Sequence, residues 1–242
     1  MKKIMIKISL AAGALAVMAG CQDNLWDEHY GLNGTVETRN LMQVLESMPE
    51  YSEFCSVVKR VGLDSVLATD QTFTVWAPDN EAMAGYTVNA ETKSQFLENH
   101  ISRYLYGGVD LADTSSVRVK MLNGKSQDYA RENGNYTFAG VPVKAEEIPA
   151  GNGLVHGLSR IAPFYYNLYE NICQEGNGTD SLAAFLTSFD EYTFNEEKST
   201  AIGKNASGQI VYDSIFDFNN DWLRRYGHLH SEDSVYTMIV PL

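Results

Sequence analysis

The sequence lacks the motifs on which common enzyme classes depend. It contains no Gly-x-Ser-x-Gly nucleophile elbow, no His-Glu-x-x-His metal pair, no Gly-x-x-x-x-Gly-Lys phosphate loop and no Cys-x-x-Cys pair. Basic residues are also scarce, with 18 Lys and Arg against 31 Asp and Glu, and a surface of that sign repels phosphate backbones. We therefore expect no enzymatic activity, no cofactor and no nucleic-acid partner.

A long hydrophobic run is absent as well. The apolar stretch at residues 8–18 is shorter than the about 20 residues that a membrane-crossing helix needs. Lys2, Lys3 and Lys7 precede it, and a basic start followed by a short apolar run is the order of a secretory signal. The sequence therefore predicts that residues 1–20 are a signal peptide.

Small residues come directly before Cys21. Met18-Ala19-Gly20-Cys21 resembles the bacterial lipobox, in which the cysteine thiol accepts diacylglycerol before cleavage, and the alternative is an ordinary cleavage site beside a chance cysteine. The acidic stretch after Cys21 resembles signals that send some Gram-negative lipoproteins to the cell surface. We expect a lipid-anchored protein of the outer membrane, exposed at the cell surface, with residues 21–37 as a polar tether.

Two further cysteines, Cys55 and Cys173, permit one disulfide in an oxidising compartment. Cys55 lies in a helical apolar pattern, which favours a small buried hydrophobic side chain, and the sequence alone leaves the pairing open. The hydrophobic fraction of 44% is that of a folded globule, and the length after the tether suits one large or two modest domains.

Helical patterns come first in the folded region and strand patterns follow. Apolar residues recur at helical spacing over residues 41–48, 54–61 and 92–106, while residues 72–77 are a β-branched and aromatic run ended by Pro78. Asp79 can cap a short helix over residues 81–83. From residue 117 onwards, short strands alternate with Asn-Gly and Gly turns until a strand at 154–161. This order predicts an α+β domain.

Four blocks of this region resemble the fasciclin-like (FAS1) domain family and follow the family's order. They are residues 72–83 (TFTVWAPDNEAM), 97–101 (LENHI), 122–124 (LNG) and 150–163 (AGNGLVHGLSRIAP). The resemblance covers residues 38–165 and implies an α+β fold, a wedge or sandwich of short β-strands packed with several helices. It also implies extracellular adhesion or matrix association as the activity.

The resemblance points to a few candidate binding residues. Family members used in animal cell adhesion often have Tyr before the central His, where this sequence has Asn99, and the difference puts integrin-like binding in doubt. His100, Asn152 and His156 remain as weak binding candidates. A structural role is favoured for each, with imidazole nitrogens bonded to backbone groups and Asn152-Gly153 forming a turn.

The C-terminal part repeats the start of the first domain. Residues 235–241 (VYTMIVP) align with residues 73–78 (FTVWAP) when Thr237 is placed on Thr74, and helical stripes at 168–172 and 182–189 precede them. The alignment predicts an incomplete second fasciclin-like domain at residues 166–242. Truncation of a longer tandem ancestor is the favoured explanation, and completion by a partner chain or packing of this part on the first domain are the alternatives.

The remaining candidate for chemistry is His228-Leu229-His230 with Glu232 and Asp233. A structural zinc site needs four arranged ligands, and short clusters of this kind are usually solvated, so we expect no metal.

The leading hypothesis is a surface lipoprotein that acts in adhesion or binds extracellular protein or glycan. The alternative is a structural accessory of an outer-membrane nutrient-uptake assembly, and a hydrolase is the outside possibility.

Overall fold

The computed structural model describes residues 37–108, 111–199, 201–204, 207–212, 215–233 and 236–239. Residues 39–242 form one compact unit, and the elements below all belong to it. The expected signal peptide, Cys21 and residues 22–36 of the tether lie outside the described residues. Within the described ranges, no helix combines the length and the apolar character that crossing a membrane requires.

Helices and strands are largely segregated along residues 39–165, as the expected α+β class requires. The helical elements are α3 (Leu41–Glu46), η2 (Pro49–Tyr51), α4 (Ser52–Arg60), α5 (Asp64–Leu67), η3 (Thr92–Phe96) and η4 (Leu97–Asn99). The strands are β1 (Phe73–Pro78), β2 (Ile101–Ser102), β3 (Ser115–Lys120), β4 (Ser126–Glu132), β5 (Asn135–Phe138), β6 (Val141–Ala150) and β7 (Gly153–Leu158).

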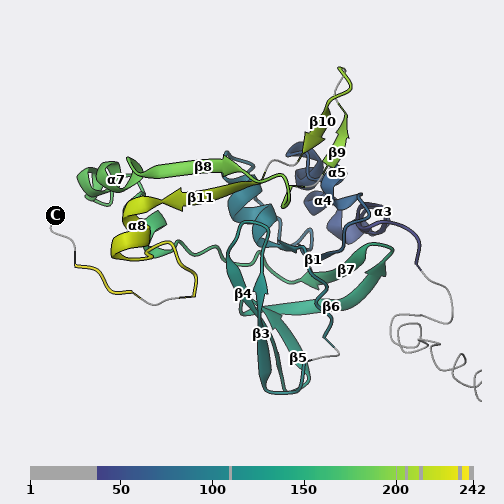
Figure 1. Cartoon of the computed structure of the whole chain (residues 1–242). Helices are drawn as coiled ribbons and strands as arrows, with labels where there is room; N and C mark the ends of the chain where they lie inside the picture. Colours follow the sequence, from purple (N-terminus) through teal and green to yellow (C-terminus); the bar gives the residue numbers. More distant parts are fainter. Residues whose placement is uncertain are drawn as a thin grey trace, which may run out of the picture. The chain divides into compact units, whose positions relative to one another are not determined.

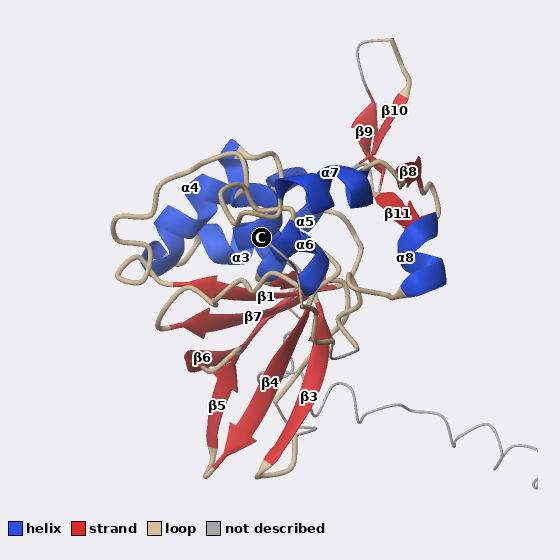
Figure 2. Ribbon diagram, turned by 90° about the vertical axis from the view of Figure 1, so that its left-hand side faces the viewer, coloured by secondary structure: helices blue, strands red, loops and turns tan. Residues whose placement is uncertain are grey.

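These seven strands form one sheet in the order β2-β1-β7-β6-β5-β4-β3. Strand β1 pairs with β7 in parallel, and the other neighbours pair antiparallel. Figure 2 shows α3, α4 and α5 gathered over the β1 and β7 end of the sheet, while β3, β4 and β5 extend away from them. The expected meander of hairpins is therefore present as β3 to β6.

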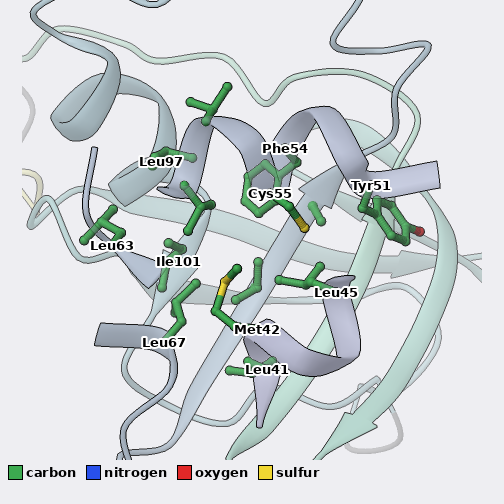
Figure 3. Close-up of a cluster of buried hydrophobic side chains, with 14 of the residues drawn as sticks. Leu41, Met42, Leu45, Tyr51, Phe54, Cys55, Leu63, Leu67, Leu97 and Ile101 are labelled. Carbon is green, nitrogen blue, oxygen red and sulfur yellow. The ribbon is translucent and has the colours of Figure 1, made fainter. Parts of the chain in front are cut away.

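Strand β1 is buried along its whole length because its two faces contribute to different cores. Alternate side chains of a strand point to opposite faces. Phe73, Val75 and Ala77 belong to the core under the helices, whereas Trp76 belongs to a second core with the side chains of β3 to β6. Figure 3 shows the first core, to which α3 contributes Leu41 and Leu45 and α4 contributes Phe54 and Cys55, with Leu45 lying near Cys55.

The helix expected over residues 92–106 ends early. It is replaced by the short η3 and η4 and then by strand β2, in which Ile101 pairs with Val75 of β1. The carbonyl oxygen of Ile101 also accepts a hydrogen bond from the Leu122 backbone, at 2.8 Å. The apolar side chains of this segment are buried at the edge of the sheet, so strand pairing with a distant segment overrides the local helical pattern.

The short helix expected after Asp79 is likewise absent. The segment is a turn, in which the Asp79 carboxylate accepts a hydrogen bond from the Ala82 backbone N–H at 2.8 Å.

Residues 168–226 contain two helices, then four short strands and then a third helix; the strands and α7 and α8 are labelled in Figure 1. The elements are α6 (Leu168–Ile172), α7 (Asp180–Thr187), β8 (Asp190–Phe194), β9 (Ala201–Lys204), β10 (Ile210–Tyr212), β11 (Phe216–Asn220) and α8 (Asp221–Tyr226). Strands β8 and β11 form one two-stranded sheet, and β9 and β10 form another. Of the strand expected at residues 235–241, Tyr236–Ile239 carry no strand, and the others lie outside the described residues.

Candidate functional site

His100 lies inside the fold of residues 39–165 with no exposed surface. Its Nδ1 donates to the Phe96 carbonyl at 2.7 Å, and its Nε2 accepts from the Ala162 backbone N–H at 2.9 Å. Burial lowers the pKa of the imidazole to about 4, and the bond to Phe96 opposes this only in part. The neutral ring therefore ties the η3–η4 segment to the chain beyond β7.

His156 of β7 is enclosed in the second core. It stacks on the Trp76 ring at 5.6 Å, donates through Nε2 to the Tyr106 carbonyl at 2.9 Å and accepts through Nδ1 from the Glu147 backbone at 3.3 Å. Desolvation lowers its pKa, against the raising effects of the Tyr106 bond and of Glu147. Both ring nitrogens are thus bonded to backbone groups.

Asn152 connects the start of α3 to the segment before β1. Its Oδ1 accepts from the Leu41 backbone at 2.8 Å, and its Nδ2 donates to the carbonyls of Leu67 and Thr69 at 2.9 and 2.6 Å. Asn99 is buried in a similar way, donating to the Pro163 carbonyl at 3.1 Å and accepting from Gln127 at 2.9 Å. The structure places these side chains inside the domain, and it does not bring them together in a cleft.

A hollow lies between the β3–β4 turn and the C-terminal region. Its volume is about 690 Å³, and its lining combines three aromatic rings with two imidazoles and several charges. The rings belong to Tyr169, Tyr192 and Phe218, and the imidazoles to His228 and His230. A cavity of this size with convergent polar groups is the usual form of a small-ligand site.

The floor of this hollow is a buried ion pair. Lys125 is 5% exposed and contacts both Glu170 and Glu232, the latter at 2.8 Å. Its ammonium also lies 5.2 Å from the centre of the Phe164 ring. A buried cation needs such compensation, because removal from water is costly. Lys125 therefore fastens α6 and the segment around residue 232 to the turn between β3 and β4.

A second hollow, of about 570 Å³, adjoins the first and shares Lys120, Asn123 and Gly124 with it. It is lined on one side by Arg103 and Tyr104 and on the other by residues of the β11 end of the C-terminal hairpin, including Phe216 and Asp217. The two hollows together form a groove, here called the hairpin groove, between the β8–β11 sheet and the β3–β4 turn.

The sequence also singled out the histidines at 228 and 230 and the cysteines at 55 and 173. In the part of the chain that the structure describes, no three His, Cys, Asp or Glu side chains are arranged to hold a metal ion. His228 and His230 lie with ring centres 6.0 Å apart. Cys55 and Cys173 are both free thiols, and Cys55 is buried under α3 as its apolar pattern indicates. Desolvation raises the pKa of Cys55 to about 11, so its thiol stays protonated and unreactive.

One protein-family model matches part of this chain. The family model that matches is described as "Fasciclin domain", and the match runs over residues 49–162. Residues 49–162 are therefore similar to the fasciclin domain family. The match contains η2 to β7, the whole seven-stranded sheet and both buried histidines, so the sequence blocks that resembled the family are confirmed at the level of the domain.

Individual relatives are distant. The pig "Transforming growth factor-beta-induced protein ig-h3" is 27% identical over 50% of this chain and 19% of its own length, and human "Stabilin-1" is 26% identical over 62% of this chain and 6% of its own. "Protein sll1483" of Synechocystis is 23% identical over 52% of this chain and 74% of its own. This chain therefore spans only a small part of the first two relatives.

A solved structure is also similar. It is that of a FAS1 domain pair from the insect cell adhesion molecule Fasciclin I, at 20% identity and a TM-score of 0.43, covering 53% of this chain and 51% of that one.

Sequence reasoning identified one edge of the hairpin groove, the segment with His228, His230, Glu232 and Asp233, but considered it only as a metal site. Lys125 stands in an ordinary Asn-Gly turn, and its partners Glu170 and Glu232 are 45 and 107 residues away. A second signal was the density of aromatic residues after residue 166, in which the spacing indicated only helical stripes. Pairing of β8 with β11, which creates the aromatic wall, joins segments that no local pattern connects.

Proposed function

We propose that this protein is a surface-anchored lipoprotein that binds extracellular macromolecules in adhesion. The lipobox at Cys21 supports the anchoring, and the fasciclin-like domain supports the extracellular setting, since the solved relative is named as a cell adhesion molecule. The absence of catalytic motifs in the sequence is consistent with a role in binding.

The observation that carries this proposal is an exposed aromatic cluster on α7 and α8. Phe185 lies 5.3 Å from Phe189 and 5.9 Å from Trp222, and Trp222 lies 5.2 Å from Tyr226, between ring centres. Phe185 and Tyr226 are 47% and 71% exposed. Exposed aromatic residues grouped in this way mark contact surfaces, because aromatic side chains supply much of the energy of protein interfaces.

The test uses the mature chain without its lipid, immobilised and exposed to a panel of extracellular matrix proteins. We expect saturable binding to at least one of them, weakened about tenfold or more by Phe185→Ala, because removing a central aromatic side chain of an interface costs about 2 kcal/mol. Tyr165→Ala is the matched control, since Tyr165 is 70% exposed and lies outside the cluster. Absence of binding to the whole panel, or equal binding by both variants, contradicts the proposal.

A second candidate is a structural accessory of an outer-membrane assembly. Its support is the two-stranded β8–β11 sheet, in which each strand pairs only with the other among the described residues. A strand edge of this kind can accept a strand from another chain. Crosslinking in intact cells separates the two candidates, because recovery of an integral outer-membrane protein as the main adduct favours the accessory role.

A further inference from the structure

The hairpin groove has one aromatic wall. In the β8–β11 sheet, Tyr192 is paired with Phe218 and Phe194 with Phe216, so all four rings stand on the same face. Ring centres are 5.4 Å apart in the first pair and 5.8 Å in the second. Tyr192 and Phe218 line the larger hollow and Phe216 lines the smaller one, while Tyr192 and Phe216 keep 65% and 53% of their surface exposed.

The opposite wall is polar. The β3–β4 turn contributes Lys120 and Asn123 to both hollows, and Glu232 contributes a carboxylate beside them. His230 also lines the larger hollow, with its ring centre 5.4 Å from that of Phe218. The groove therefore offers donors and acceptors on one side and ring faces on the other.

The charges of the groove nearly cancel. Its cations are Arg103, Lys120, Lys125 and Lys198, and its anions are Glu170, Glu197, Asp217, Glu232 and Asp233. Lys125 is paired with Glu170 and Glu232, and Lys198 is paired with Asp217 at 2.5 Å. Four cations against five anions leave a net charge of −1, so the groove gives little advantage to a strongly charged polymer of either sign.

We infer that the hairpin groove binds a neutral oligosaccharide of pyranose units. A pyranose ring has an apolar C–H face, which packs on an aromatic ring, and an edge of hydroxyl groups, which both donate and accept hydrogen bonds. The aromatic wall and the polar wall match these two sides. The inference depends on the proposed function only in needing the groove to face the extracellular medium, and it uses a different surface from the α7–α8 cluster.

The experiment measures binding of the mature chain to defined sugars by titration calorimetry. The probes are the neutral hexaoses of α-linked glucose, β-linked glucose, β-linked mannose and β-linked galactose, with polygalacturonate and heparin as anionic comparators. We expect saturable binding of at least one neutral hexaose and weaker binding of the two polyanions. Tyr192→Ala should weaken the neutral binding about tenfold or more, because it removes the most exposed ring of the wall.

Two controls make the result decisive. Tyr165→Ala removes an equally exposed tyrosine outside the groove and should bind the hexaose as the unmodified protein does. Circular dichroism and the thermal midpoint of Tyr192→Ala show whether its fold is retained, and Tyr192→Phe, which keeps the ring, should retain binding within about threefold. Binding of no neutral sugar, preference for the polyanions, or unchanged affinity in Tyr192→Ala overturns the inference. Retained binding to matrix proteins in the same preparation would leave the proposed function standing.

Discussion

Protonation of two buried histidines is coupled to folding. His100 has a folded-state pKa of about 4, and burial lowers the pKa of His156 in the same direction, whereas an unfolded histidine titrates near 6.5. The unfolded chain therefore takes up protons first as the pH falls. The stabilising contribution of each neutral ring is fully present above pH 6.5 and is lost between pH 6.5 and the folded-state pKa.

From this linkage we expect the free energy of unfolding to fall by about 3 kcal/mol between pH 7 and pH 4 on account of His100 alone. Urea titrations at intervals across this range measure it. His100→Gln is the comparison variant, since Gln keeps a donor and an acceptor but does not titrate. It should be less stable at pH 7 and show a flatter dependence below pH 6.5. An equally steep fall in the variant would assign the pH dependence to other groups.

Among the glycines that the structure describes, Gly153 has the least space for an added side chain. Its φ is +156°, and a Cβ built there would lie 1.9 Å from the Phe73 carbonyl oxygen. Gly153→Ala should therefore cost about 3 kcal/mol or more of unfolding free energy, because the parallel pairing of β1 and β7 has to shift. Gly124→Ala is the control, since Gly124 also has a positive φ, of +81°, with no atom within 4 Å of such a Cβ. Its cost should stay near 1 kcal/mol, from backbone strain alone. Urea unfolding of both variants at pH 7 distinguishes the cost of the steric clash at Gly153 from the cost of backbone strain alone at Gly124.

At the scale of elements, the attachment of α6 to the fasciclin-like domain depends on the Lys125 ion pair. Lys125→Met leaves Glu170 and Glu232 without their cation, and breaking a buried pair in this way costs about 3 kcal/mol. We expect hydrogen exchange to become faster in α6 and around residue 232 and to change little in β1 and β7. The exposed pair of Lys198 with Asp217 provides the control, and Lys198→Met should cost less than about 1 kcal/mol. Equal effects of the two variants would contradict this attachment.

Local patterns predicted the elements whose boundaries are set by local chemistry. Helix α3 begins at the Asn40 capping box with Gln43, and strand β1 ends at Pro78, both of which are visible in sequence. The pattern at residues 92–106 predicted a helix beyond Asn99 that is absent, because Ile101 pairs with Val75 instead. Strands β8 and β11 were not predicted as a pair, since 21 residues separate Phe194 from its partner Phe216 and cross-strand pairing carries no local periodicity.

At the scale of the whole molecule, the proposed lipid anchor at Cys21 predicts where the protein is located in the cell envelope. Cys21→Ala should move the protein from the membrane fraction to the soluble fraction of the cell envelope, because no acyl chain can then be attached. Cys173→Ala is the control and should stay in the membrane fraction, since Cys173 is a free thiol within the folded part. Fractionation followed by immunoblotting measures both, and mass spectrometry of the mature N-terminal peptide identifies the lipid. Unchanged membrane retention of Cys21→Ala would disprove lipid anchoring through this residue.

The sequence by itself determined the candidate signal peptide and lipid site, the α+β class and the fasciclin-like blocks, because each depends on residues that are adjacent or regularly spaced. The sequence favoured a structural role for His100, Asn152 and His156, and only the tertiary structure showed which backbone groups each of them bonds. The hairpin groove also exists only in the tertiary structure. Its buried ion pairs join Lys125 to residues more than 40 positions away along the chain, so no local sequence pattern predicts them.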